Sequence, residues 1–334
     1  MEATPASAEA RHQILISAVA AAVMAPSSHN TQPWRFRIVG GVLEVLADPR
    51  RHLTVIDAER RQLVQSCGCA LFNARVAVRA MGYADQVTVF PDPQQPDLLA
   101  TLQLGKQIIT DDGDRALMHA LPLRRTNRRP FLPRPVALAD SDAMIAAAAG
   151  DGVWIVRLAP DQKHQVGKLV DRADRLQYRD PAFRIELSSW LTAAGSRRRD
   201  GIPFVEKEYG SAMPFSVMRA LRSPGLGDSF GRLEEELVRG SPVVMVLGTD
   251  GDAPWDWLAA GQALQGLLLD ATGLGLAAAF LNQALELPDL RAEVARSVGR
   301  AGQPQMILRL GYPEEPIHRA APRRSLDDVL LIVE

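Results

Sequence analysis

The sequence predicts an α+β fold. Three patterns carry this prediction: an apolar helical segment followed by a strand hairpin, a long helix followed by strands, and a second half in which helices and strands return in a loosely similar order. The chain has 334 residues, of which 47% are hydrophobic and 23% charged. It is therefore long enough for a large buried core, and its composition is typical of a globular protein.

The first half begins with the small and polar residues 1–10, which we expect to be disordered. Gln13–Met24 is predicted as a helix that Pro26 halts. Gly40-Gly41 lies between two strand-like runs and is a two-residue hairpin signal. Residues 111–114 form an acidic loop without the ligand pattern of a calcium site, so we expect no metal there. The other elements expected here are strands Trp34–Val39 and Val42–Ala47, helix Arg60–Met81, and strands Val87–Phe90 and Leu99–Leu104.

The second half contains a long segment, Arg179–Leu237, that we interpret as irregular. Such a segment is uncommon unless it serves as a lid or a binding loop. It carries large apolar side chains at Trp190, Phe204, Tyr209, Met213 and Phe215. The elements expected around it are helix Ala139–Ala149, strand Val153–Leu158, helix Asp161–Tyr178, strand Val243–Gly248, helix Trp255–Thr272, and strands Leu276–Phe280 and Gln305–Leu310.

Charge and cysteine usage exclude several classes of function. The net charge of −1 creates no overall field that would attract nucleic acid or an anionic membrane. Cys67 and Cys69 lie in a predicted helix, where this spacing points them to different sides, so neither a metal pair nor a redox pair is indicated. Ile14–Ala25 resembles a signal-peptide core, but Glu2 and Glu9 precede it and it is too short to span a bilayer. We therefore expect a buried helix and a cytosolic protein.

A basic stretch, LRRTNRRPF at Leu123–Phe131, is the first candidate for binding chemistry. It places four arginines within six residues. Guanidinium groups offer planar pairs of N–H donors that match phosphate oxygens. Pro130 prevents a helix from running through the stretch, so we expect an extended arm. The residues alone leave two interpretations open: an anion-binding arm, or a solvated charged surface.

A second stretch, APSSHNTQPWRF at Ala25–Phe36, follows the first predicted helix directly. Its hydroxyl, carboxamide and indole groups are unusually dense for a plain turn. The alternative is that they only cap and form a turn, since Ser and Asn favour such positions. We expect Trp34 to lie in the core, and a lone His29 in a polar loop is no evidence for catalysis.

Taken together, the two stretches resemble the flavin-dependent nitroreductase superfamily. In that superfamily an arm of the type R-x-[ST]-x-[KR] holds the FMN phosphate, and a helix ending in P-S-S-x-N-x-Q-P-W borders the flavin. Here the helix comes first and the arm follows it. The sequence is most similar to the Acg-type branch, in which one chain resembles a fused dimer. The resemblance implies two similar halves, residues 1–113 and 114–334, packed as a pseudo-dimer, with a lid insert at about 179–237.

The resemblance also implies the residues that hold the cofactor. It assigns the phosphate to the arm and to a basic pair near the C-terminus, whose alternative role is surface charge. The chain departs from the family pattern after the strand that ends at Phe280, where the usual acidic-Gly step is missing, so the donor to flavin N5 is not defined. The implied FMN-binding residues are Arg124, Arg125, Thr126, Arg128, Arg323 and Arg324 for the phosphate, and Ser27, Ser28, Asn30, Gln32, Leu281, Asn282 and Gln283 beside the flavin.

Two functions follow from the resemblance. In the first, NAD(P)H reduces a non-covalently bound FMN, which then reduces a quinone, a nitro compound or a similar acceptor. The second is an FMN-sequestering or storage protein in which the insert covers the flavin. The enzyme needs no acid–base residue from the protein, because the flavin carries the redox chemistry. We expect one FMN in a monomeric chain, and no metal, nucleic acid or membrane as a partner.

Overall fold

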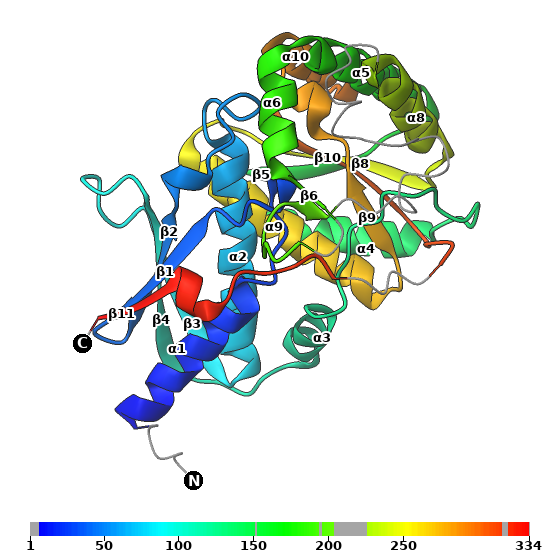
Figure 1. Ribbon diagram of the computed structural model, residues 1–334. Helices are drawn as coiled ribbons and strands as arrows, with labels where there is room; N and C mark the ends of the chain where they lie inside the picture. Colours follow the sequence, from blue (N-terminus) through cyan, green and yellow to red (C-terminus); the bar gives the residue numbers. More distant parts are fainter. Residues whose placement is uncertain (1–6, 151, 194–195, 204–225, 316–319, 334) are drawn as a thin grey trace.

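The computed structural model describes residues 7–150, 152–193, 196–203, 226–315 and 320–333 (Figure 1). The first half begins with α1 (Ala8–Ala22), which the side chain of Ser7 caps. It continues with η1 (Ser28–Asn30), β1 (Trp34–Val39), β2 (Val42–Ala47), η2 (Pro49–Arg51), α2 (Arg61–Ala80), β3 (Tyr83–Val89), β4 (Leu98–Gln107) and α3 (Asp112–Ala120).

The second half adds a second layered unit to the first. Its elements are α4 (Leu138–Ala148), β5 (Val153–Arg157), α5 (Pro160–Arg179), α6 (Pro181–Trp190), β6 (Leu191–Thr192), β7 (Ile202–Pro203), α8 (Leu226–Gly240), β8 (Val243–Thr249), α9 (Pro254–Gly273), β9 (Ala277–Phe280), η4 (Asn282–Leu285), α10 (Pro288–Val298), β10 (Gln303–Gly311), α11 (Leu326–Val329) and β11 (Leu330–Val333).

The strands form two main sheets, one from each half, and the last strand of the chain joins the sheet of the first half. The first sheet has the order β11-β1-β2-β4-β3, and the second has the order β5-β8-β10-β9. The last strand, β11, lies parallel to β1, so the end of the chain joins the sheet of the first half. Gly40 and Gly41 turn β1 into β2 with φ of 55° and 78°, which confirms the predicted hairpin.

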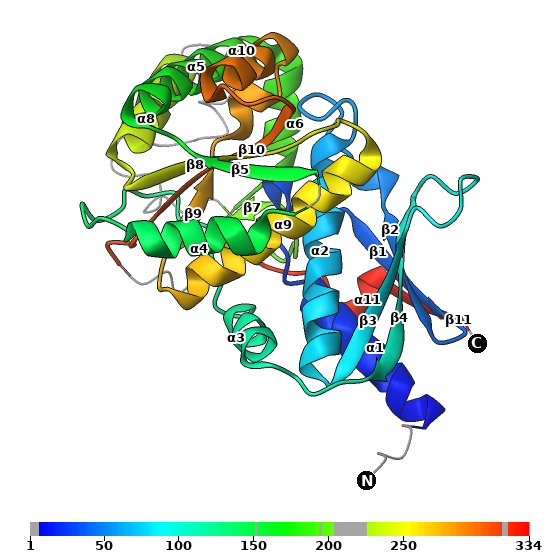
Figure 2. The same cartoon turned by 180° about the vertical axis from the view of Figure 1, so that it is seen from behind.

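Helices α2 and α9 lie between the two sheets and connect them (Figure 2). The two helices approach each other backbone to backbone. A Cβ on Gly68 would lie 2.4 Å from the carbonyl oxygen of Leu258, and a Cβ on Gly261 would lie 2.0 Å from that of Gln65. Only glycine fits both positions, so the two halves share a tight central contact.

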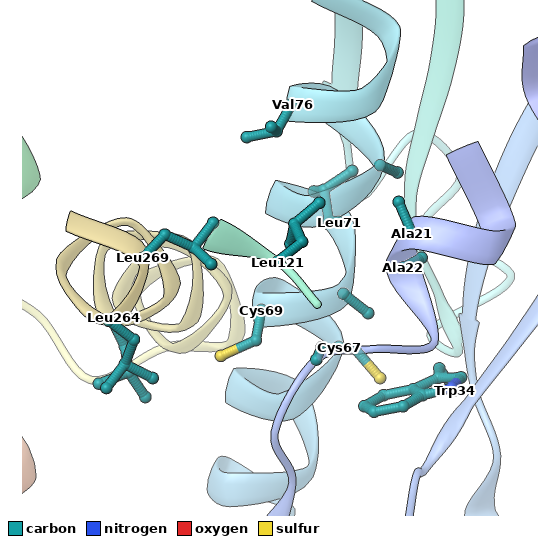
Figure 3. Close-up of a cluster of buried hydrophobic side chains, with 14 of the residues drawn as sticks. Ala21, Ala22, Trp34, Cys67, Cys69, Leu71, Val76, Leu121, Leu264 and Leu269 are labelled. Atoms are coloured by element: carbon teal, nitrogen blue, oxygen red, sulfur yellow. The ribbon is translucent and has the colours of Figure 1, made fainter. Parts of the chain in front are cut away.

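One hydrophobic core spans both halves, and a second core lies between the second sheet and helices α5, α8 and α10. Figure 3 shows part of the first core, where Cys67 points toward Trp34 and Cys69 toward Leu264 of α9. Both cysteines are free and buried, and burial raises the pKa of the Cys69 thiol to about 12. The prediction that they point to different sides of one helix, with Trp34 in the core, is confirmed.

The structure corrects three predictions. The first helix already begins at Ala8, so the expected disorder over residues 1–10 is wrong for residues 8–10, and residues 1–6 lie outside the described part. The acidic residues 111–114 begin α3, because Asp111 accepts a hydrogen bond from the Asp114 N–H at 2.7 Å and caps the helix. The segment 179–237 is not irregular throughout, since it contains α6 and most of α8.

Some elements had no prediction at all, namely α10, α11 and β11. The second core explains α10, whose apolar residues Leu290, Val294 and Val298 lie on one face. Among the described residues, no helix is long and apolar enough to cross a membrane.

Candidate functional site

A cavity of about 990 Å³ lies where the two halves meet. The first half contributes the turn after α1 and the first turns of α2. The second half contributes the loop between α3 and α4, parts of α5, α6 and α8, the segment after β9, and the tail before α11. Both halves therefore build its wall.

The loop between α3 and α4 is held extended along one end of the cavity. Thr126 forms a parallel bridge with Ala278 of β9, and the Asn127 N–H donates to the carbonyl oxygen of Ala278 at 2.8 Å. The guanidinium of Arg309, which is buried in β10, donates to the carbonyl oxygens of Asn127 at 3.2 Å and Arg129 at 3.1 Å. The backbone of the arm is thus fixed, while the side chains of Arg124, Arg125, Thr126 and Arg128 line the cavity.

Three arginines meet at this end of the cavity with unpaired N–H groups. Within the described part of the chain, the buried Nε and Nη1 of Arg124, Nε of Arg125 and Nε of Arg323 have no hydrogen-bond partner. Burial lowers the pKa of Arg124 to about 10 and that of Arg323 to about 9. The neighbouring arginines lower both pKa values further, and no carboxylate is among the causes. Such a site favours an anion.

The turn after α1 faces the same end and is strained. His29, Asn30 and Gln32 all have left-handed φ values, of 49°, 53° and 50°. The Ser27 hydroxyl accepts from the Gln32 N–H at 2.9 Å, and the Asn30 side-chain oxygen accepts from Nη1 of Arg323 at 2.9 Å. Backbone strain of this kind persists only where the surroundings impose it, and it gathers at functional sites.

His29 lies in this turn with its Nδ1 buried and without a partner among the described residues. Burial and then the charge of Arg128 lower the pKa of His29 to about 4, so the imidazole is neutral at pH 7.

The structure brings most of the predicted FMN-binding residues to the cavity wall. Ser27, Ser28, Asn30, Asn282, Gln283 and Arg323 line it together with the arm. Three predicted residues do not line it. Leu281 is buried in the second core, and the side-chain oxygen of Gln32 accepts from the Arg324 N–H at 2.8 Å below the turn. The guanidinium of Arg324 donates to the carbonyl oxygen of Asp328 at 2.6 Å and supports the tail.

Another part of the cavity is acidic, and sequence reasoning missed it. Glu286 is held by amide groups of Gln62 at 2.8 Å and Gln177 at 2.6 Å, and Gln62 also accepts from the hydroxyl of Ser28. Burial is the main cause of the raised pKa values of Glu286 and Asp174. The sequence does carry one signal of this part of the cavity. Asp174 and Gln177 lie nearly one helical turn apart among the apolar residues of α5, and polar side chains are rarely buried without a reason.

Three described parts of the predicted insert border the cavity: α6, the part of α8 up to Leu237, and residues 196–203. Residues 196–203 are here called the covering segment. From α6, Phe183 and Leu187 line the cavity, and Glu186 accepts from the N–H groups of Val55 at 3.0 Å and Ile56 at 3.2 Å. The side-chain amide of Gln32 donates to the carbonyl oxygen of Arg199 at 2.7 Å. Trp190 lies under the guanidinium of Arg198 and outside the cavity, whereas Phe204, Tyr209, Met213 and Phe215 lie outside the described residues.

No group of His, Cys, Asp and Glu side chains suited to a metal ion occurs among the described residues. The polar groups that line the cavity are guanidinium, amide, hydroxyl, imidazole and carboxyl groups. This donor set fits an organic anion with a polar ring system.

Comparison with known proteins identifies the family of the chain. Residues 123–312 match the model of the nitroreductase family. A protein of Mycobacterium tuberculosis named "Putative NAD(P)H nitroreductase Rv3131" is 34% identical over 314 residues, covering 92% of this chain and 88% of that protein. Another, named "Putative NAD(P)H nitroreductase acg", is 30% identical over 326 residues and covers 95% of both.

The chain belongs to the nitroreductase family. The full-length similarity to the acg protein confirms the resemblance to the Acg-type branch and is consistent with a pseudo-dimeric single chain. The crystal structure of a nitroreductase with bound FMN from Bacteroides fragilis matches 65% of this chain and 98% of that chain, at 15% identity and a TM-score of 0.42.

Proposed function

We propose that the protein binds one FMN non-covalently and is an NAD(P)H-dependent oxidoreductase. The observation that carries the proposal is the anion-binding site made by Arg124, Arg125 and Arg323, each of which has at least one buried guanidinium nitrogen without a partner among the described residues. A phosphate monoester would accept several charge-assisted hydrogen bonds there, each contributing about 1.5–3 kcal/mol. The names of the relatives support NAD(P)H as the electron donor.

The residues of the cavity would hold the cofactor between the two halves. The arm and the tail bind the phosphate, while the strained turn at Ser27–Asn30 and the segment Asn282–Gln283 border the ring system. When bound, FMN supplies hydride transfer from NAD(P)H to a quinone, a nitro compound or a similar acceptor. The protein positions it, excludes water and provides N–H groups that stabilise negative charge. We also propose that residues 1–113 and 114–334 are the two family-like halves, since each supplies part of this wall.

Removing one guanidinium tests the phosphate site. Arg124→Ala or Arg323→Ala is expected to raise the Kd for FMN by about tenfold or more, because each removes at least one charge-assisted hydrogen bond. The measurement is fluorescence titration of the FMN-free protein, with flavin absorbance giving one FMN per wild-type chain.

Arg115→Ala is the matched control, because Arg115 lies on α3 just before the arm and its side chain is 57% exposed. It should leave the Kd unchanged. Equal flavin retention in all three variants would show that the arm and the tail do not bind the phosphate.

A second function, storage of FMN, is favoured by one observation: the covering segment and α6 are both hydrogen-bonded to the first half. A cover that stays closed would keep the nicotinamide away from the flavin. The rate at which NAD(P)H reduces bound FMN in the wild type and in Glu186→Ala separates the two functions.

A further inference from the structure

The cavity has a second end whose polar groups are acceptors rather than donors. It is formed by α5, α8 and the segment around η4, whereas the arginines come from the loop between α3 and α4 and from the tail. In both views of the molecule, α5 and α8 lie above β8 and β10, while α3 lies below them (Figures 1 and 2). Among the described residues, no carboxylate contributes to the shifted pKa of Arg124 or Arg323, whereas Arg128 and Arg309 lower the pKa of Glu234.

Three side-chain oxygens at this end have no hydrogen-bond partner among the described residues: Oδ2 of Asp174, Oε1 of Gln177 and Oε1 of Gln283. Asp174 is 4% exposed and Gln177 is 5% exposed, and both line the cavity. The orientation of the Gln177 amide is fixed, because its nitrogen donates to Glu286 at 2.6 Å. Buried acceptors need donors, so these oxygens fit a ligand that carries several N–H groups.

Several carboxyl groups gather at this end. Burial is the largest cause of the raised pKa of Asp174. The neighbouring carboxyl groups of Glu234 (α8), Glu286 (after η4) and Asp171 (α5) raise this pKa further, and a hydrogen bond from the Gln283 amide lowers it. Arg309 and Arg128 lower the pKa of Glu234, so this carboxyl group also lies near the arm. A positive charge on the ligand would offset the repulsion among these carboxyl groups.

The wall beside these oxygens is aromatic. Tyr178 contacts Phe183 edge to face at 5.3 Å and stacks on Phe230 at 5.2 Å, and all three residues line the cavity. Aromatic faces bind flat apolar groups and attract cations.

We propose that the acidic end is a substrate subsite that binds a planar, apolar molecule through a positively charged, N–H-rich group such as an amidinium or an ammonium. Asp174 accepts from this group, with Gln177 and Gln283 beside it. The inference rests on the proposed function, because it names the class of electron acceptor that would occupy the cavity beside FMN.

Three nearly isosteric probes test the charge preference: benzamidine, benzamide and benzoate, which carry a positive, a neutral and a negative group on the same ring. Isothermal titration calorimetry at pH 7 on the full-length protein, with and without FMN, gives each Kd. Benzamidine is expected to bind about tenfold or more tightly than benzamide, and benzoate more weakly than both. Asp174→Asn should abolish this preference, and Glu234→Gln should reduce it severalfold.

Asp161→Asn is the matched control, since it makes the same change on an exposed position of α5 outside the cavity. It should retain the preference. Equal binding of the three probes, or an unchanged preference in Asp174→Asn, overturns the inference. So does a loss of FMN affinity in Asp174→Asn with benzamidine binding intact, because Asp174 would then face the flavin. Failure of the wild-type protein to bind FMN instead refutes the proposed function, and the FMN-free titration still decides the inference.

Discussion

At the scale of single residues, the site combines buried groups that are held in unfavourable states. His29 has a left-handed backbone and an imidazole nitrogen without a partner in the described part of the chain, and Arg124 and Arg323 are buried cations beside each other. Each of these states costs free energy in the FMN-free protein. A bound anion would relieve the arginines, which explains why such residues are tolerated together.

His29 gives a pH prediction for the FMN-free protein. Its pKa is about 4 in the folded state and about 6.5 in the unfolded chain, so the unfolded chain binds the proton first. Stability is therefore lost as the pH falls from about 6.5 toward 4. His29→Asn removes this titration, and Asn tolerates the left-handed backbone. The loss of unfolding free energy between pH 8 and pH 5 should therefore be about 1–2 kcal/mol smaller in the variant than in the wild type.

Urea unfolding at the two pH values measures this difference. His164→Asn, at an exposed position of α5, should show no such recovery. An equal acid-induced loss in His29→Asn and the wild type would contradict the burial of a neutral imidazole.

At the scale of elements, the crossing of α2 and α9 positions the site. Gln62 and Gln65 of α2 and Leu264 of α9 line the cavity, and all three lie within about one turn of the glycine contact. Gly68 and Gly261 make the close approach of α2 to α9 possible.

Gly261→Ala tests this crossing. Its Cβ would lie 2.0 Å from the carbonyl oxygen of Gln65, so one helix must move and the variant should lose about 2–3 kcal/mol of unfolding free energy. Gly266→Ala on the same helix is the control, because its Cβ would meet only the end of the Phe72 ring at 3.3 Å. Thermal and urea unfolding compare the two, and a similar small effect of both variants would argue against the tight crossing.

At the scale of the whole molecule, the second half covers a cavity that the first half helps to build. Asp200 pairs with Arg51 at 2.8 Å, the Gly201 N–H donates to the carbonyl oxygen of Asn30 at 3.2 Å, and Glu186 holds the loop at Val55–Ile56. These contacts hold the covering segment and α6 against the first half, beside the turn that borders the proposed FMN.

Glu186→Ala is expected to loosen α6 and to accelerate reduction of bound FMN by NAD(P)H severalfold, because access would no longer wait for opening of the cover. Anaerobic stopped-flow absorbance measures the rate. Ile185→Ala, a neighbouring change at a position that is 70% exposed, should leave it unchanged. Equal rates in the wild type and Glu186→Ala would reject the lid, and no reduction in either form with FMN bound would favour storage over catalysis.

The sequence by itself determined the features that depend on local patterns. Alternating apolar residues around Gly40-Gly41 specify the hairpin, and helical spacing specifies α2, α5 and α9 to within one or two residues at each end. The arginine arm and the PSSHNTQPW stretch indicated the family, because several residue types at fixed spacing are rarely combined by chance. The capped starts of α3 and α6, at Asp111 and Asp180, are local signals of the same kind.

Only the tertiary structure decided which residues face the cavity. Asp174, Gln177 and Glu286 belong to no motif, and folding brings them together from α5 and the segment after η4. Likewise, Gln32 and Arg324 match the family pattern but do not line the cavity, because the Gln32 side chain accepts from the backbone N–H of Arg324 and the Arg324 guanidinium donates to the carbonyl oxygen of Asp328. The physical reason is that side-chain direction depends on how distant elements pack, and a sequence pattern records the position of a residue along one element only.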